Sequence, residues 1–473
     1  MSAGGGLAGA GAGNAGGLLA FGGVLGMAAA SGGYFPQSWG WAALVLAWTA
    51  ALALLLGSPR RPSRLELAFV GGLLAVAAWT GLSAVWSQSV PATVLEVERD
   101  AVYLAGLAAA LVLTRRGVED GVLAAAVVVC AWNLVSRLHG YDSSVPGAGA
   151  QPIGYANGLG LLAAMGTVLA LRRPRTLPAL AVLVPALVLA DSDGSYLALA
   201  AGIAVALRPR LAPLVALGAA VVVLAGLHGH ERARYWDVAL ADAGAQPALG
   251  SGGGTFAQQW IERRKDDLST VDAHSLELET LAELGVVGLA VLAGTISLPF
   301  VRGGGAALGA YAAWVVQSGI DWEWELPAVT LAGLLCGLAA LARPLPGDES
   351  SLGRGGRAAG VAVALGLAAF ALVGLVGNRR IAQAEAYRRA NDPRALAAAD
   401  SAARWAPWSA EPLRVRYAVT GSLPLLRRAI AKDPHDWSLW QLLAEHGSGA
   451  EKRRAAAKAA RLNPLGAGKA PSG

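Results

Sequence analysis

Long apolar segments recur along most of this chain, and each is close to the length that a helix needs to cross a lipid bilayer. Such a helix requires about 20 mostly apolar residues, with about 17 as the lower limit. The pattern predicts an all-α, polytopic membrane protein with about 12–13 transmembrane helices. The candidate segments, of which the fourth, seventh and eighth are short, cover 15–32, 39–57, 67–86, 100–114, 120–136, 154–171, 177–190, 194–207, 211–228, 278–300, 304–320, 326–342 and 358–377.

The composition excludes an ordinary soluble enzyme and a disordered protein. Hydrophobic residues make up 55% of the chain and charged residues only 15%, whereas soluble domains average roughly 45–50% and about 25%. Both cysteines, Cys130 and Cys336, lie in apolar runs, which excludes a disulfide framework and a cysteine-based metal site. His228 and His230 are too isolated to indicate a metal site, because such a site needs more ligands.

The arginines of the joints predict the orientation of the chain. Fourteen lie in joints that follow even-numbered segments, whereas the short joints after odd-numbered segments hold only Arg99 and Arg137. Positive residues remain on the cytoplasmic side, so the N-terminus is expected inside. We therefore expect a multi-pass protein of the cytoplasmic membrane whose joint 229–275 and tail 378–473 are extracytoplasmic.

Three regions follow from these patterns: a flexible Gly/Ala leader at 1–14, a transmembrane domain at 15–377 and a helical tail at 378–473. The tail is Ala-rich, and each of its prolines at 407, 434 and 464 follows an amphipathic stretch. This resembles tetratricopeptide-like helix pairs, although a plain helical cap fits equally well. Its basic surface could contact anionic headgroups, an anionic glycan or a protein partner, or could simply be solvated.

Candidate chemistry is concentrated in the joint 229–275. Arg232 and Arg234 stand at its start, and the planar fork of donors on arginine suits phosphate oxygens. Two such residues could grip a lipid diphosphate, or could serve only as interfacial anchors beside Tyr235 and Trp236. Farther along, Gly250 and Gly252 open a glycine-rich turn whose backbone N–H groups could approach an anion.

His274 is the candidate general base. Asp272 is predicted to cap the following helix, which would place His274 in the first turn, where the helix dipole disfavours imidazolium. A neutral imidazole at the membrane surface can accept a proton. Glu277, three residues on, would share its face and orient the ring, while Glu283 lies deeper. The alternative is an ordinary interfacial histidine.

Two further groups lie on the predicted outer side. Arg99 stands among carboxylates at the entrance of the fourth segment. Between the eleventh and twelfth segments, carboxylates interleave with indoles, a pattern that fits either a sugar-binding platform or an aromatic belt. The residues of this second group are Asp321, Trp322, Glu323 and Trp324.

The stretch RARYWDVALADAGAQPALGSGGGTFAQQW, followed by DAHSLELETLAELGVVGLA, resembles the signature of bacterial O-antigen ligases and O-antigen polymerases. That signature has an Arg four residues before a Trp, a Pro-x-x-Gly-x-Gly turn with an aromatic residue, and a His opening a helix that ends Glu-Leu-Gly. The segment PIGYANGLG looks like an upstream segment of the family, and DWEWELP and the tail look like actinobacterial members. The matching residues are Arg232, Trp236, Pro247, Gly250, Gly252, Phe256, His274, Glu283 and Gly285.

This resemblance implies a fold related to the GT-C glycosyltransferases and a reaction that uses no metal, cofactor or nucleotide sugar. A glycan would move from undecaprenyl diphosphate to the hydroxyl of a glycan or lipid acceptor. His274 would deprotonate that hydroxyl, Arg232 would bind the diphosphate and Arg234 would assist. Relatives often carry arginines where this chain has the residues 149–151 and Asp193. The chain would therefore use Arg99 or Arg137 instead, take a different donor, or be a degenerate relative.

Two other classes of function remain open. A transporter or flippase would show inverted repeats and ionisable residues near the membrane midplane, whereas the charges here cluster at the predicted outer surface. A non-catalytic scaffold would use the tail 378–473 to recruit a protein partner. Membrane lipids are expected contacts in every case, and nucleic acid in none.

Overall fold

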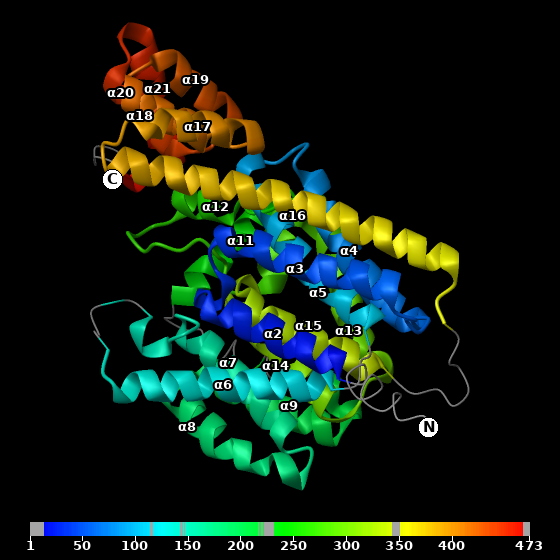
Figure 1. Ribbon diagram of the computed structural model, residues 1–473. Helices are drawn as coiled ribbons and strands as arrows, with labels where there is room; N and C mark the ends of the chain where they lie inside the picture. The colour runs from blue at the N-terminus through cyan, green and yellow to red at the C-terminus, as the bar shows by residue number, and fades with distance from the viewer. Residues whose placement is uncertain are drawn as a thin grey trace. The chain divides into compact units, whose positions relative to one another are not determined.

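The computed structural model describes residues 14–113, 117–141, 145, 147–215, 217, 218, 221, 231–342 and 351–466. In these residues all repetitive structure is helical, and Arg60 and Ser351 form an isolated β-bridge (Figure 1). The predicted all-α class is confirmed. The leader, His228 and His230, and most of the predicted segment 211–228 lie outside the described residues.

Five described helices are long and apolar enough to cross a membrane, by length and composition. At a rise of about 1.5 Å per residue, the shortest of them reaches the roughly 30 Å of a hydrocarbon core. They support a helical membrane protein. The five are α3 (Pro36–Leu56), α4 (Arg64–Ser83), α6 (Val118–Leu138), α13 (Leu276–Arg302) and α16 (Arg354–Arg389).

Other predicted segments form helices that are shorter, or that start elsewhere. The predicted pair 177–190 and 194–207 is indeed two helices, separated by Asp191 in a left-handed conformation. The helix that covers most of the predicted segment 100–114 is longer than that segment, because α5 (Val90–Val112) begins ten residues earlier and keeps its charged residues helical. The shorter helices are α2 (Ala15–Ala29), α7 (Ala156–Ala170), α8 (Leu180–Ala190), α9 (Asp193–Leu207), α14 (Gly305–Ser318) and α15 (Pro327–Leu341).

The chain divides into two compact units. The first unit takes its residues from 1–75, 99–228 and 292–371, and the second from 76–98, 229–291 and 372–473. Helices α4, α5, α13 and α16 contribute residues to both.

Close contacts between small residues hold the first unit together. A Cβ on Gly309 of α14 would lie 2.4 Å from the carbonyl oxygen of Gly202 on α9, so the two backbones meet where neither has a side chain. Likewise, a Cβ on Gly121 of α6 would lie 2.1 Å from the carbonyl oxygen of Gly17 on α2. Such contacts are typical of helices that associate in lipid, where apolar side chains gain little from leaving the solvent.

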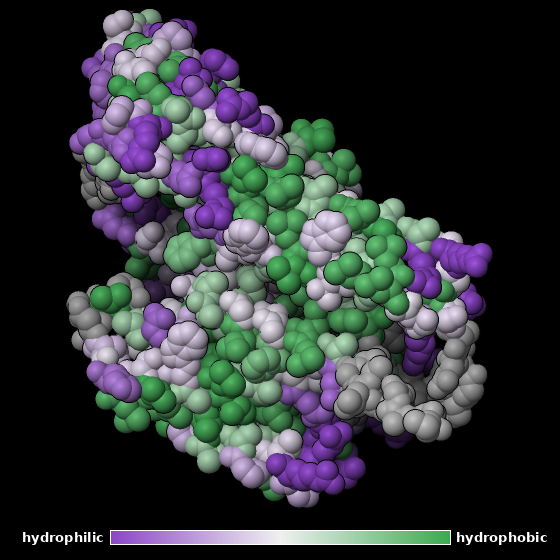
Figure 2. Space-filling model, viewed as in Figure 1, coloured by the Kyte–Doolittle hydropathy of each residue, from purple (hydrophilic) through white to green (hydrophobic). Residues whose placement is uncertain are grey.

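The first unit also presents a strongly apolar surface. On α3, Val45, Trp48, Leu52 and Leu55 are each about half exposed, at 49–62%. Figure 2 shows that apolar side chains cover much of the visible surface over α2 and α3. A contiguous surface of this kind indicates contact with lipid or with another protein, which agrees with the long apolar helices.

The second unit contains the joint 229–275 and the tail, which is helical, as its pattern predicts. Each tail helix packs on the next along the chain, around a core that includes Leu413, Leu426, Leu439 and Leu443. The helices of this unit, besides the shared ones, are α11 (Glu231–Ala245), α12 (Phe256–Arg263), α17 (Arg394–Trp405), α18 (Glu411–Thr420), α19 (Leu423–Lys432), α20 (Trp437–His446) and α21 (Gly449–Leu462).

Candidate functional site

A cluster of aromatic residues joins α11, α12 and the loop before α13. Trp260 of α12 is 1% exposed, and its indole N–H donates to the carbonyl of Leu268 at 3.0 Å. The ring of Tyr235 on α11 meets Trp260 edge to face, with centroids 4.9 Å apart. Burial of these large rings stabilises the loop as a fixed support rather than a loose connection.

His274 rests on this support. Its ring lies against the ring of Tyr235, with centroids 4.9 Å apart and planes inclined by 37°. Its Nδ1 lies 3.2 Å from the carbonyl oxygen of Asp272. A carbonyl can only accept a hydrogen bond, so Nδ1 carries the proton and, in the neutral ring, the lone pair belongs to Nε2.

The predicted start of the helix at this histidine is wrong. Helix α13 begins at Leu276, and His274 has a left-handed φ of 55°. Ser275 occupies the capping position instead of Asp272, since its hydroxyl accepts from the N–H of Leu278 at 3.4 Å. The i, i+3 relation expected with Glu277 is therefore lost, and Glu277 is partly buried in the first turn without orienting the ring.

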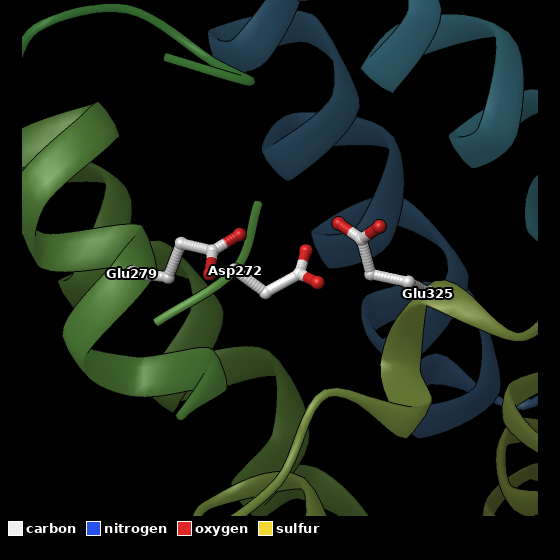
Figure 3. Close-up of side chains that lie close together, drawn as sticks. All are labelled: Asp272, Glu279 and Glu325. Atoms are coloured by element: carbon white, nitrogen blue, oxygen red, sulfur yellow. The ribbon is translucent and has the colours of Figure 1, made fainter. Parts of the chain in front are cut away.

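A carboxylate holds the backbone in front of His274. Glu279 accepts the N–H of Ala273 at 2.6 Å, and its carboxylate lies within 4.8 Å of that of Asp272. Figure 3 shows Glu279 projecting from α13 and Asp272 from the loop that precedes it. This bond fixes the residue next to the histidine, which accounts for the unusual backbone of His274.

Arg232 and Arg234 have different surroundings. Arg232 is partly buried on α11, three residues before Tyr235 and hence on the same helix face. Arg234 instead forms an ion pair with Asp266 of the loop that follows α12. Hydrogen bonding to that guanidinium holds the pKa of Asp266 below its usual range. Arg234 thus ties α11 to the loop, and its fork is already engaged.

The glycine-rich turn does not offer free N–H groups. Gly254 and Phe256 each donate to the carboxylate of Glu283 at 2.8 Å, and Gly252 donates to the Glu283 backbone carbonyl at 2.8 Å. Gly250 donates its N–H to the backbone carbonyl oxygen four residues before it, at 2.9 Å. The turn does hold an anion, but that anion is the side chain of Glu283. Gly250, Gly252 and Glu283 therefore build the support of the site.

Glycine is required at this turn by its backbone. Gly250 and Gly252 have φ values of 70° and 108°, in the left-handed region. A Cβ on Gly250 would lie 2.2 Å from the backbone of Glu283, and one on Gly252 would lie 2.3 Å from the hydroxyl of Ser87. No side chain fits at either position without moving the backbone beside it.

The tail is attached to the same support. The carbonyl of Gln88 accepts a hydrogen bond from Nδ1 of His435 at 2.9 Å, and the hydroxyl of Ser89 donates to Asp433 at 3.0 Å. Gln88 also donates its N–H to the carbonyl of Ser251 in the glycine-rich turn at 3.0 Å. Burial raises the pKa of Asp433 to about 7.

The first unit holds the remaining predicted residues. Arg99 forms an ion pair with Glu325 at 2.9 Å, and both side chains are nearly buried. Its guanidinium lies 5.8 Å from the ring centroid of Trp39. Arg137 donates to the carbonyl of Leu189 at 3.0 Å. Neither arginine lacks a partner, so neither is a ready substitute for the family arginines.

The predicted sugar platform is also a packed structure. The ring of Trp322 lies 4.3 Å from that of Tyr155, and Tyr155 donates its hydroxyl hydrogen to Asp321 at 2.9 Å. The Glu323 side chain is fully buried and accepts a hydrogen bond from the side-chain amide of Gln317 at 2.5 Å. The Trp324 side chain is only 7% exposed. Because these faces are used internally, the interpretation as an open platform is wrong for Glu323 and Trp324.

The sequence pattern does not indicate the role of Tyr235, which stands there only as a neighbour of the candidate anchors Arg232 and Arg234. The pattern also misses Asp242, which is buried and accepts the Ser251 hydroxyl at 2.6 Å. The spacing of Arg232 and Tyr235 was a usable signal, since a separation of three residues places both on one helix face.

No protein-family model matches the chain, and no curated protein matches it. The functional conclusion therefore depends on the residues of this chain and on their arrangement.

Proposed function

We propose that this protein is a membrane glycan ligase or polymerase of the O-antigen ligase type, acting at the outer face of the cytoplasmic membrane. Its donor is a saccharide on undecaprenyl diphosphate, and its acceptor is a hydroxyl of a glycan or lipid. The proposal includes a GT-C-like membrane domain, an extracytoplasmic joint 229–275 and an extracytoplasmic, tetratricopeptide-like tail.

One observation carries the proposal. The ring of Tyr235 packs on His274, and Arg232 lies one helical turn before Tyr235, so the candidate base packs on the helix that carries the candidate diphosphate-binding residue. A base and an anion-binding group on one rigid support are what transfer from a lipid diphosphate requires.

In the proposed reaction, Nε2 of His274 accepts the proton of the acceptor hydroxyl. The acceptor oxygen forms a bond to the anomeric carbon, and the bond between that carbon and the diphosphate oxygen breaks. The electron pair of that bond leaves with the diphosphate, and Arg232 offsets the charge that develops there. The bond from Nδ1 to the Asp272 carbonyl keeps the ring in the tautomer that the step needs.

A network of hydrogen bonds and an ion pair explains how the loop is held in place. Glu279 fixes the backbone at Ala273, Arg234 ties α11 to the loop, and Glu283 holds the glycine-rich turn. A catalytic group must be placed to within a fraction of an ångström, and such placement depends on hydrogen-bonded supporting residues.

The test is transfer by the purified full chain in proteoliposomes that contain undecaprenyl-diphosphate-linked oligosaccharide and an acceptor glycan. Release of undecaprenyl diphosphate and formation of the longer product are both measured. His274→Ala should lower the rate by about 100-fold or more, as expected for loss of a general base. Arg232→Ala should lower it strongly, and Arg232→Lys should restore only part of it, because an ammonium lacks the planar fork.

Arg404→Ala, which removes an exposed arginine of the tail, is the matched control and should keep the wild-type rate. A flippase would move the donor across the bilayer without releasing undecaprenyl diphosphate. A scaffold would support polymer synthesis in a null strain even when it carries His274→Ala. Either result would overturn the proposed transferase.

A further inference from the structure

The tail carries a groove of about 540 Å³ between α19, α20 and α21. Its floor is apolar and is made by Ile430 of α19 and by Trp440 and Leu443 of α20. The indole N–H of Trp440 donates to the carbonyl of Pro434 at 2.9 Å, which fixes the orientation of the ring. The groove therefore presents one firmly held aromatic ring on a buried apolar base.

The rim of the groove is basic. Arg427 of α19 and Glu451 of α21 form a two-bonded ion pair at 2.7 and 2.9 Å, which joins the two helices and balances its own charge. Arg454 and Lys458 of α21 also line the groove, and they share one helix face because they are four residues apart.

These two cations are available to a ligand. Within the described part of the chain, neither the Arg454 nor the Lys458 side chain makes a hydrogen bond or an ion pair within 4 Å, and the acid that interacts electrostatically with Arg454, Glu451, is already paired with Arg427. The surroundings add to their potential, since α19 carries three basic residues and α21 carries five, whereas the acids of the three groove helices are Glu445 and Glu451. A concave surface with this charge attracts anions and excludes cations.

We propose that this groove binds an acidic saccharide, with one sugar ring on Trp440 and a carboxylate of the saccharide at Arg454 and Lys458. Pockets of about 300–1,000 Å³ hold small ligands of one or a few rings, which is the size of a short oligosaccharide segment and too small for a helix. A pyranose ring has an apolar face that packs on an indole, while its polar edge requires donors of the kind that arginine and lysine provide.

The site lies wholly in the tail and shares no residue with the loop that carries His274. It can therefore be tested independently of the proposed transfer reaction.

The test is equilibrium binding of tetragalacturonate to the full chain in nanodiscs of phosphatidylcholine, by isothermal titration calorimetry. The test variant is Arg454→Ala/Lys458→Ala. The matched control is Lys452→Ala/Arg453→Ala, which removes the same two charges from exposed positions of α21 outside the groove. The test variant should weaken binding by about tenfold or more, as for loss of charge-assisted contacts. The control should weaken it by less than about twofold, because separated surface charges are screened.

Two further comparisons define the ligand. Trp440→Phe should retain binding and Trp440→Ala should abolish it; if the alanine variant fails to fold, the pair of charge variants decides. Neutral maltotetraose should not bind, and His274→Ala should bind tetragalacturonate like the wild type.

Equal loss of binding in both charge variants would mean that only the general basic character of the tail attracts the probe. Binding of tetraglutamate that is as tight, and that depends on Arg454 and Lys458, would identify a peptide groove. Each of these results would overturn the proposed acidic saccharide site.

Discussion

The carboxylate of Glu283 should be among the most important single groups for the stability of the second unit. It is 6% exposed and accepts the N–H groups of Gly254 and Phe256, both at 2.8 Å. The substitution Glu283→Gln keeps the size of the side chain but replaces one acceptor oxygen by an NH₂ group. One of the two N–H donors then faces another donor.

The size of the effect follows from these contacts. A hydrogen bond to a charged group contributes about 1.5–3 kcal/mol, and a buried donor left without an acceptor costs about as much. We expect Glu283→Gln to reduce the free energy of unfolding by about 2–3 kcal/mol, and Glu283→Ala by about 3–5 kcal/mol. For a unit of this size, in which 1 kcal/mol shifts the unfolding temperature by about 2–4 °C, the glutamine variant should lower that temperature by roughly 4–12 °C.

Thermal unfolding of the detergent-solubilised chain, followed by tryptophan fluorescence, measures this shift. Trp260 lies in the affected region and should report it. Asp237→Asn removes an exposed carboxylate from the neighbouring helix α11 and is the control. If Glu283→Gln unfolds at the same temperature as Asp237→Asn, the carboxylate does not hold the turn, and our account of the turn is wrong.

Three further predictions follow from the same structure. Burial raises the pKa of Asp433 from 3.8 to about 7, so its contribution to stability is fully present below about pH 4 and is lost as the pH rises through about 7. The rate of proteolysis of the tail, measured across this pH range, should lose that dependence in Asp433→Asn. An unchanged pH dependence in the variant would contradict the prediction. Gly309→Ala should destabilise the first unit by about 1–3 kcal/mol, because the new Cβ would lie 2.4 Å from a backbone oxygen of α9. Gly22→Ala, which has open space at its Cβ, should leave the stability unchanged. Equal unfolding temperatures in the two variants would refute the close contact. Tyr235→Ala should lower the transfer rate more than about tenfold, because it removes the ring that packs on His274. Tyr235→Phe should keep most of the wild-type rate. Equal rates in the two variants would exclude a role for the ring.

The helices could be predicted from the sequence because their signal is local and long. Apolar segments of about 20 residues identify α3, α4, α6 and α13 with ends that differ by a few residues. The start of α5 could not be predicted in this way. Its charged residues look like a boundary, but Glu98 is buried within the helix and accepts a hydrogen bond from Asn378 at 2.6 Å, a partner that lies 280 residues away.

The candidate site shows the same limit. Its residue types could be predicted, since Arg232 and His274 stand in a long charged joint between apolar segments. The backbone at His274 could not, because its left-handed conformation depends on the bond from Ala273 to Glu279. The glycine-rich turn does bind an anion, as its sequence predicts, but the anion is the carboxylate of Glu283, which lies outside the turn.

The order in which the ribosome makes this chain has a consequence for its maturation. The second unit combines 76–98, 229–291 and 372–473, and the bond between Ser89 and Asp433 joins residues that are 344 positions apart. The loop near residue 88 is therefore synthesised long before its hydrogen-bond partners in the tail, Asp433 and His435. A chain halted before α19 would carry both His274 and Arg232, yet the segment beside the glycine-rich turn would still lack its contacts from the tail.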